Sequence, residues 1–276
     1  MTSEQNPMAL EVILASGSPR RRDLLAATGM AFTVRTPASP VDESLEPDQL
    51  AWPEEAAKKL AERKAAAVVQ ELLAESPVGM FLVLGADTMV VKDGRIFGKP
   101  RNLDDAKAML RALSGATHDV LTAVSCWMVA APDPEKLSVG FRTFIDKSRV
   151  AFRTLSDDEI ADYLRKGESF DKAGAYAIQG EGAALVERYE GALDTIIGLP
   201  VERLLREFPE LAPDGGAESG AAAPAEVGAA AEAGAPAEAG AAGGGAYSSV
   251  AGMLFRSAEG QASSDGTAFA EDALEL

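Results

Sequence analysis

The sequence changes character at residue 213, and this change limits which part of the chain can fold. Between residues 213 and 246 hardly any apolar side chain is larger than alanine, and ordering such a segment costs more conformational entropy than burial returns. The segment 213–276 carries 1 basic and 10 acidic side chains, against 25 and 33 in residues 1–212. We expect this segment to be disordered, and an interaction arm is the alternative. The predicted parts are a flexible N-terminus (1–9), one folded domain (10–212) and an acidic Ala/Gly-rich disordered tail (213–276).

Composition excludes several classes of protein. The single cysteine, Cys126, cannot form a disulfide framework, which favours a reducing cytoplasm. No apolar run is long enough to span a bilayer, so we expect no membrane partner. A net charge of −17 argues against wrapping nucleic acid but allows a small anionic ligand in a local basic pocket. With one histidine and one cysteine, a metal would be a hard, oxygen-bound cation such as Mg²⁺ or Mn²⁺ rather than zinc.

Residues 10–212 mix strands and helices without a regular repeat. Strand-like apolar runs lie at 12–15, 32–35, 81–84, 119–130 and 139–152. Residues 89–97 form a predicted hairpin, and Pro53 opens a long Ala-rich helix that ends near Glu75. Antiparallel hairpins among helices predict an α/β or mixed α+β fold, rather than a doubly wound parallel sheet.

Residues 14–21 predict a strand, a tight turn and a helix whose start favours an anion. Ser18 suits the N-cap position and Pro19 the first helical position. Arg20 and Arg21 then lie in the first turn, where cations oppose the helix dipole. Free backbone N–H groups, small hydroxyls and two guanidinium groups would together cradle a phosphate. The alternative is a surface helix that happens to begin Pro-Arg-Arg-Arg.

Two charged residues lie in otherwise apolar surroundings. Asp87 follows the apolar run 81–84, and we expect it at the end of that strand, a usual place for a catalytic or metal-binding carboxylate. A plain turn aspartate is the alternative. Lys64 shares a helical stripe with apolar neighbours four residues away on either side, so it either extends to water or pairs with an anion.

Three further segments carry chemically useful groups. Lys99 lies in a Gly-Lys-Pro sequence that lacks the spacing of a phosphate-binding P-loop. The run 171–180 is rich in small residues that let the backbone approach a ligand, and its Gln179 either recognises a nucleobase edge or satisfies its own loop. The single histidine, His118, follows a glycine turn at a strand start, which favours a structural role over general-base catalysis.

Taken together and in this order, these segments resemble the Maf family of nucleoside triphosphate pyrophosphatases. The matching pieces are Ser16–Arg21, Asp42–Glu43, Lys64, Gly85–Thr88, Gly98–Pro100, Leu113–Gly115 with His118, Asp171–Gly180 and Gly198–Pro200. The resemblance covers roughly residues 10 to 208. It implies an α/β fold with an elongated mixed sheet flanked by helices around a central cleft, related to the inosine-triphosphate pyrophosphatases and often a homodimer.

The resemblance also implies roles for individual residues. Asp87 would be the catalytic proton acceptor, and Glu43 a second catalytic carboxylate that, with Asp87, holds a divalent metal (Mg²⁺ or Mn²⁺). The residues that would bind the substrate phosphates are Ser18, Arg20, Arg21, Lys64 and Lys99. Those that would set substrate preference are Arg20, Thr88 and Gln179.

These three specificity residues imply dTTP and UTP as substrates, hydrolysed to the nucleoside monophosphate and pyrophosphate. In the cell, this reaction would serve house-cleaning of the nucleotide pool, with a possible link to cell-division arrest. Alternatives are a purine (ITP/XTP-type) or 7-methyl-GTP pyrophosphatase, and a non-catalytic nucleotide-binding regulator of septum formation.

Overall fold

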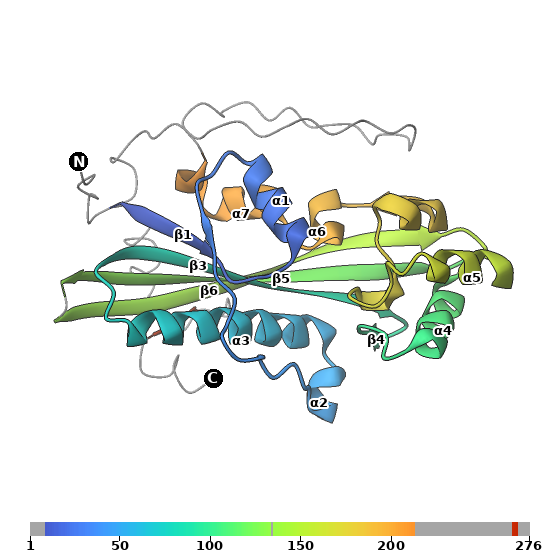
Figure 1. Cartoon of the computed structure of the whole chain (residues 1–276), viewed down its shortest axis with the longest axis horizontal. Helices are drawn as coiled ribbons and strands as arrows, with labels where there is room; N and C mark the ends of the chain where they lie inside the picture. Colours follow the sequence, from blue (N-terminus) through green and yellow to red (C-terminus); the bar gives the residue numbers. More distant parts are fainter. Residues whose placement is uncertain (1–8, 134, 213–266, 270–276) are drawn as a thin grey trace.

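An elongated mixed sheet forms the frame of the protein (Figure 1). The computed structural model describes residues 9–133, 135–212 and 267–269. In these ranges the strand order is β2 (Thr33–Val34), β1 (Leu10–Leu14), β3 (Gly79–Lys92), β5 (Thr117–Asp133), β6 (Lys136–Phe152) and β7 (Val186–Glu190), with β4 (Arg95–Phe97) beside β3 and β8 (Thr267–Phe269) beside β6. The β1 strand runs parallel to β2 and β3, and the other pairs are antiparallel. The expected mixed α/β fold is confirmed.

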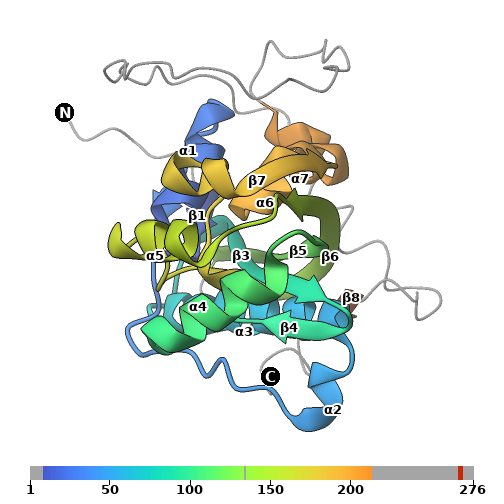
Figure 2. The same cartoon turned by 90° about the vertical axis from the view of Figure 1, so that its right-hand side faces the viewer.

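Helices cover both faces of the sheet (Figure 2). One face carries α3 (Pro53–Ala74), which follows the short α2 (Pro47–Leu50). The other face carries α1 (Pro19–Ala27), α6 (Leu193–Ile197) and α7 (Val201–Glu207), while α4 (Leu103–Leu113) and α5 (Asp157–Arg165) lie together at one end. The described residues also form three 3₁₀ turns: Ala173–Ala175, Gly180–Leu185 and Pro209–Leu211. No helix in the described ranges is long and apolar enough to cross a membrane.

The β3 strand is buried on both faces, which explains its nearly continuous apolar sequence. Successive side chains alternate between faces. Leu82 and Leu84 therefore pack with the helices α1 and α7, whereas Val83 packs against α3. By the same alternation Asp87 points toward the α3 face and its neighbour Thr88 toward the α1 and α6 face.

The expectation that Asp87 ends a short strand is wrong. The β3 strand continues to Lys92, because β5 pairs with it along an uninterrupted register from Gly79 to Val91. Gly85, which suggests a turn in the sequence, lies in mid-strand. A Cβ atom there would come within 2.6 Å of the Ala61 carbonyl oxygen on α3, so this glycine allows the helix to approach the strand closely.

The described ranges only partly overlap the predicted terminal segments. Residues 1–8 and most of the predicted tail lie outside them. Within the tail, residues 267–269 form β8, which pairs with residues 140–142 of β6.

Candidate active site

A cleft opens where the sheet is interrupted beside β3. Strand β1 pairs with β3 as far as Leu84, and β4 pairs with it again only from Val90. In the described part of the chain, residues 85–89 therefore have no strand neighbour on that edge. A cleft of about 910 Å³ lies at this interruption. It is lined by every residue for which the sequence predicts a site role: Ser18, Arg20, Arg21, Glu43, Lys64, Asp87, Thr88, Lys99 and Gln179.

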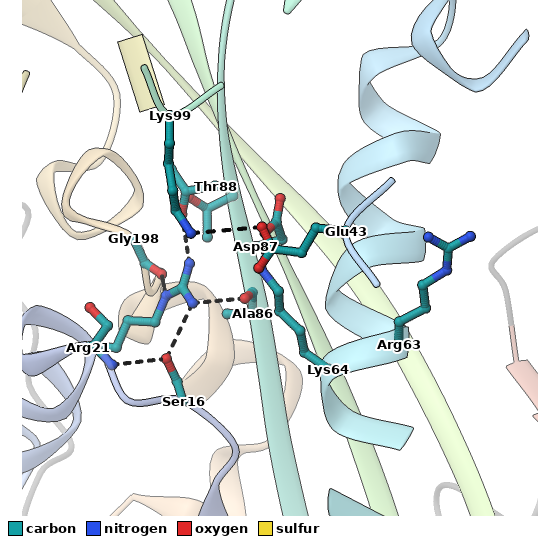
Figure 3. Close-up of polar contacts among 12 residues, drawn as sticks. Ser16, Arg21, Glu43, Arg63, Lys64, Ala86, Asp87, Thr88, Lys99 and Gly198 are labelled. Atoms are coloured by element: carbon teal, nitrogen blue, oxygen red, sulfur yellow. Dashed lines mark hydrogen bonds and ion pairs between the residues drawn. The ribbon is translucent and has the colours of Figure 1, made fainter. Parts of the chain in front are cut away.

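Two carboxylates share one lysine in this cleft (Figure 3). The Lys64 ammonium group donates to Asp87 Oδ1 at 2.6 Å and lies 3.0 Å from Glu43 Oε1. Only 16% of the Lys64 side chain and 10% of the Asp87 side chain are exposed. Lys64 thus pairs with anions instead of extending to water. Removing Lys64 would leave the largely buried Asp87 carboxylate without this cation, which proteins tolerate poorly, whereas Lys64 without Asp87 would still pair with Glu43.

A second lysine adds positive charge to the same group. Lys99 Nζ lies 3.7 Å from the other oxygen of Glu43, and its side chain is more than half exposed. Burial would raise the pKa of Glu43, but Lys64 and Lys99 together outweigh this effect and lower the pKa below its usual value. Glu43 is therefore an anion at neutral pH.

The loop that carries Glu43 is held by a residue that the sequence pattern does not single out. Arg63 on α3 donates to the carbonyl oxygens of Asp42 and Ser44, at 3.2 and 2.8 Å. The Asp42 carboxylate also accepts bonds from the backbone N–H and hydroxyl of Ser44, both at 2.9 Å. These contacts fix the backbone on both sides of Glu43. The turn at Asp42–Ser44 could have been predicted from its Asp-x-Ser sequence, since an aspartate side chain favours a hydrogen bond to the backbone two residues later. The contribution of Arg63 has no such local signal.

Arg21 fills the interruption in the sheet. Its guanidinium donates to the carbonyl oxygens of Gly198 and Ala86, both at 2.8 Å, and more weakly to the hydroxyls of Thr88 at 3.2 Å and Ser16 at 3.3 Å. Burial lowers the pKa of Arg21, an effect that nearby Asp87 opposes. The side chain thus ties the start of α1 to β3 and to the turn that follows α6.

The start of α1 differs in one detail from the expected cap. Ser18 occupies the N-cap position and Pro19 the first helical position, as predicted, but the Ser18 side chain makes no capping hydrogen bond. Its backbone N–H instead donates to Ser16 Oγ at 3.3 Å. The Ser18 hydroxyl is therefore free of the helix and lines the cleft.

Arg20 reaches across the cleft to the loop 171–180. It lies 3.5 Å from the Asp171 carboxylate, which Lys172 also contacts at 2.6 Å. About two thirds of the Asp171 side chain is exposed. Ion pairs this exposed contribute little stability, so an anionic ligand can displace Asp171 from Arg20 at small cost.

The loop 171–180 is anchored by a buried aromatic pair. The Tyr176 hydroxyl and His118 Nε2 lie 2.7 Å apart. Burial lowers the pKa of His118 to about 4, so the ring is neutral at physiological pH and has the structural role that the sequence predicts. Gln179, in contrast, makes no side-chain hydrogen bond within the described ranges and lies at the cleft. The amide therefore does not satisfy its own loop and is available to a ligand.

Asp87 and Glu43 are the carboxylates that suit a divalent cation. Mg²⁺ commonly binds through one or two carboxylates together with water and substrate phosphates. The two carboxylates of Asp87 and Glu43, which share one ammonium group, fit this pattern. No group of three or more candidate metal ligands occurs in the described residues, so these residues do not form a metal site made of protein ligands alone.

Comparison with known proteins identifies the family. Residues 11–211 match the model of the family described as Maf-like protein. The chain belongs to the Maf family. It is 45% identical over 206 residues to the dTTP/UTP pyrophosphatase of Hahella chejuensis (strain KCTC 2396), a match that covers 74% of this chain and 94% of that protein. It is 41% identical over 201 residues to the dTTP/UTP pyrophosphatase of Geobacillus sp. (strain WCH70), covering 73% and 98%.

The Maf match contains the whole cleft, because its lining residues all lie between 15 and 197. It ends at residue 211, so the acidic segment lies outside it. Among solved structures, the nucleoside-triphosphatase (dITP/XTP pyrophosphatase) of Mycobacterium abscessus is 12% identical with a TM-score of 0.30, covering 72% of this chain and 94% of that one. A TM-score this low is not evidence of a shared fold.

Proposed function

We propose that this Maf protein hydrolyses dTTP and UTP to the nucleoside monophosphate and pyrophosphate. The observation that carries the proposal is the paired Asp87–Lys64–Glu43 group in a cleft that also contains Arg20, Arg21 and Lys99. Carboxylates can position water and accept a proton, and the cations can bind a polyphosphate. The names of the two relatives, which the match covers at 94% and 98% of their length, support the same reaction.

In the proposed reaction, a water oxygen attacks the α-phosphorus while the bond from that phosphorus to the bridging α–β oxygen breaks. Asp87 accepts the proton of the water, and pyrophosphate leaves with the bridging oxygen. The arriving triphosphate competes with the carboxylates for the ammonium groups of Lys64 and Lys99, which frees Asp87 and Glu43 for this work. A divalent cation held by these two carboxylates would supply further charge neutralisation at the phosphates.

The preference for pyrimidines rests on three residues that line the cleft. Arg20, Thr88 and Gln179, which the family resemblance links to dTTP and UTP, all line the same cavity. The unbonded Gln179 amide can donate and accept hydrogen bonds, which suits the edge of a uracil or thymine ring. We include in the proposal a cytoplasmic location, supported by Cys126 as a single, free and buried cysteine, and a homodimer, as the family resemblance implies.

The test is a substrate panel on the purified full-length chain. It comprises dTTP, UTP, CTP, ITP, GTP and 7-methyl-GTP, each with Mg²⁺ or Mn²⁺, with identification of the products. We expect monophosphate and pyrophosphate from dTTP and UTP. Turnover of purines instead would overturn the pyrimidine assignment, and binding without turnover would favour the regulator of septum formation.

The Asp87→Asn variant tests the assigned proton acceptor. Loss of a preorganised electrostatic contact in an active site commonly costs about 10²- to 10³-fold in rate, so we expect turnover to fall by at least this factor with the fold intact. Asp133→Asn, at the β5–β6 turn, is the control and should keep full activity. An Asp87→Asn variant that turns over dTTP like the unmodified chain would remove Asp87 from catalysis.

A further inference from the structure

A row of polar side chains crosses the centre of the sheet beneath α6. Thr88 on β3 is directly opposite Thr122 on β5, which is directly opposite Asp146 on β6. Residues in such register point to the same face. Apolar residues flank this row on the same face, with Val124 on one side and Val120 on the other. Thr122 is fully buried, so its hydroxyl must find partners inside the protein.

The hydrogen bonds along this row have only one possible direction. Thr122 Oγ1 donates its single proton to the Thr195 carbonyl oxygen at 2.7 Å, since a carbonyl can only accept. Thr122 must therefore accept the bond from Thr88, whose hydroxyl lies 3.0 Å away. The Thr88 oxygen in turn accepts from Arg21 Nη2 at 3.2 Å. Each hydroxyl proton is thus committed along a chain that runs from Arg21 through Thr88 and Thr122 to Thr195.

Both ends of this hydrogen-bonded chain are held by the same turn. Thr195 lies in α6 and is fixed to the sheet by its own hydroxyl, which donates to Asp146 Oδ2 at 2.5 Å. Three residues later the Gly198 carbonyl accepts the Arg21 Nε–H at 2.8 Å. Gly198 has φ +125°, and a Cβ atom there would lie 3.1 Å from Thr88 Oγ1. The turn therefore packs directly on the contact between Thr88 and Arg21.

We propose that Thr122 is a positioning residue for the active site. Through Thr88 it orients the Arg21 guanidinium, four of whose five N–H groups already bond to the protein, so that the remaining Nη2–H has one fixed direction. Thr122 also accepts the hydroxyl proton of Thr88. Thr88 can therefore only accept a hydrogen bond from a ligand in the cleft and cannot donate one. Neither effect requires Thr122 to touch the substrate.

This inference rests on the proposed function for the identity of the substrate, and a double-mutant cycle tests it. Thr122→Val keeps the shape of the side chain and removes the hydroxyl. We expect it to raise KM for dTTP about tenfold, the equivalent of one net hydrogen bond, with kcat changed less than about twofold. Thr122→Ser restores the hydroxyl and should bring KM back to within about twofold of the unmodified value. In a Thr88→Val background, Thr122→Val should change KM by less than about twofold, since its route to Arg21 is already broken.

Thr143→Val is the matched control. Thr143 is also a buried strand threonine whose hydroxyl bonds to another hydroxyl, that of Ser125 at 3.0 Å, but it lies on the α3 face without a link to Arg21. We expect it to lower Tm about as much as Thr122→Val and to leave KM unchanged. An unchanged KM in Thr122→Val, or effects of Thr88→Val and Thr122→Val that multiply in the double variant, would overturn the proposal.

A binding measurement separates this inference from the proposed reaction. The Kd of α,β-imido-dUTP, a non-hydrolysable analogue, is measured by calorimetry on the same variants. If the chain binds the analogue without hydrolysing dTTP, the proposed reaction is wrong, and the series of Kd values still decides the role of Thr122. An analogue that does not bind to the unmodified chain would overturn both.

Discussion

Replacing Gly85 by alanine should damage the active site although Gly85 is not among the residues that line the cleft. The new Cβ atom would lie 2.6 Å from the Ala61 carbonyl oxygen and 2.7 Å from both the backbone nitrogen and the Cβ atom of Ala65. Two of these three contacts are with backbone, so no side-chain rotation can relieve them. To reach an ordinary contact distance, α3 must retreat from β3 by about 0.8 Å, and Lys64, next to Ala65, retreats with it.

The expected cost has two parts. Overpacking of this kind lowers the free energy of unfolding by about 1–3 kcal/mol. Moving the Lys64 ammonium by nearly 1 Å away from the cleft misplaces it for the substrate phosphates and lowers kcat/KM for dTTP by about 10²-fold, as misplacements of this size do in other enzymes. Urea unfolding followed by circular dichroism measures the first effect, and pyrophosphate release measures the second.

Val83→Ala provides the control for this experiment. Val83 lies on the same strand and face and is fully buried against α3. Its truncation leaves a cavity and costs about 2 kcal/mol, but it does not push the helix away. We expect the two variants to be similarly destabilised and to differ by about 10²-fold in kcat/KM. Equal activity in both would refute the reasoning that Gly85 sets the distance between Lys64 and Asp87.

Three further perturbations probe separate parts of the structure. His118 is buried with a pKa of about 4 against an ordinary 6.5, so between these values the unfolded chain binds a proton that the folded chain does not. The free energy of unfolding should therefore fall by about 3 kcal/mol as the pH drops from 6.5 to 4. Urea unfolding across this pH range measures this fall. The same pH dependence in His118→Gln would show that it does not come from His118. Lys64→Met leaves the Asp87 carboxylate without its cation and should lower kcat/KM at least about tenfold, whereas Lys58→Met on the same helix should not; equal rates for the two would show that Lys64 is dispensable. Gln179→Ala should alter the ratio of pyrimidine to purine hydrolysis at unchanged Tm, and a constant ratio would exclude it from base recognition.

Much of the site could be predicted because its residues lie in short, local patterns. The strand, turn and helix of residues 14–21 follow from Ser18 and Pro19, whose preferences act over a single turn. Lys64 stands out because a cation interrupts an apolar helical stripe, and that anomaly depends only on helical spacing. The structure brings both segments, and every other predicted site residue, to one cleft.

The contacts that hold these residues in place could not be predicted from the same patterns. Whether Lys64 pairs with an anion depends on Asp87, 23 residues away on another element. Thr122 in an apolar run looks like an ordinary strand residue, and its role depends on the register of β3, β5 and β6. Register is set by long-range pairing, which a local pattern does not contain. Asp87 was wrongly expected at a strand end for the same reason: β5, whose pairing continues β3 past Asp87, is distant from it in the sequence.

The interruption beside β3 explains how one cleft can use side chains from both faces of a sheet. Asp87 and Thr88 are neighbours that point to opposite faces, and in a continuous sheet the strand beside β3 would separate them. Here the open edge lets Lys64 and Glu43 approach from the α3 face and Arg21 from the α1 face. The carboxylates proposed for the chemical step thus depend on the packing of α3, whereas Arg21 and Thr88 depend on the α6 turn. Variants on the α3 side should therefore act mainly on kcat, and those on the α6 side, through Thr122, mainly on KM.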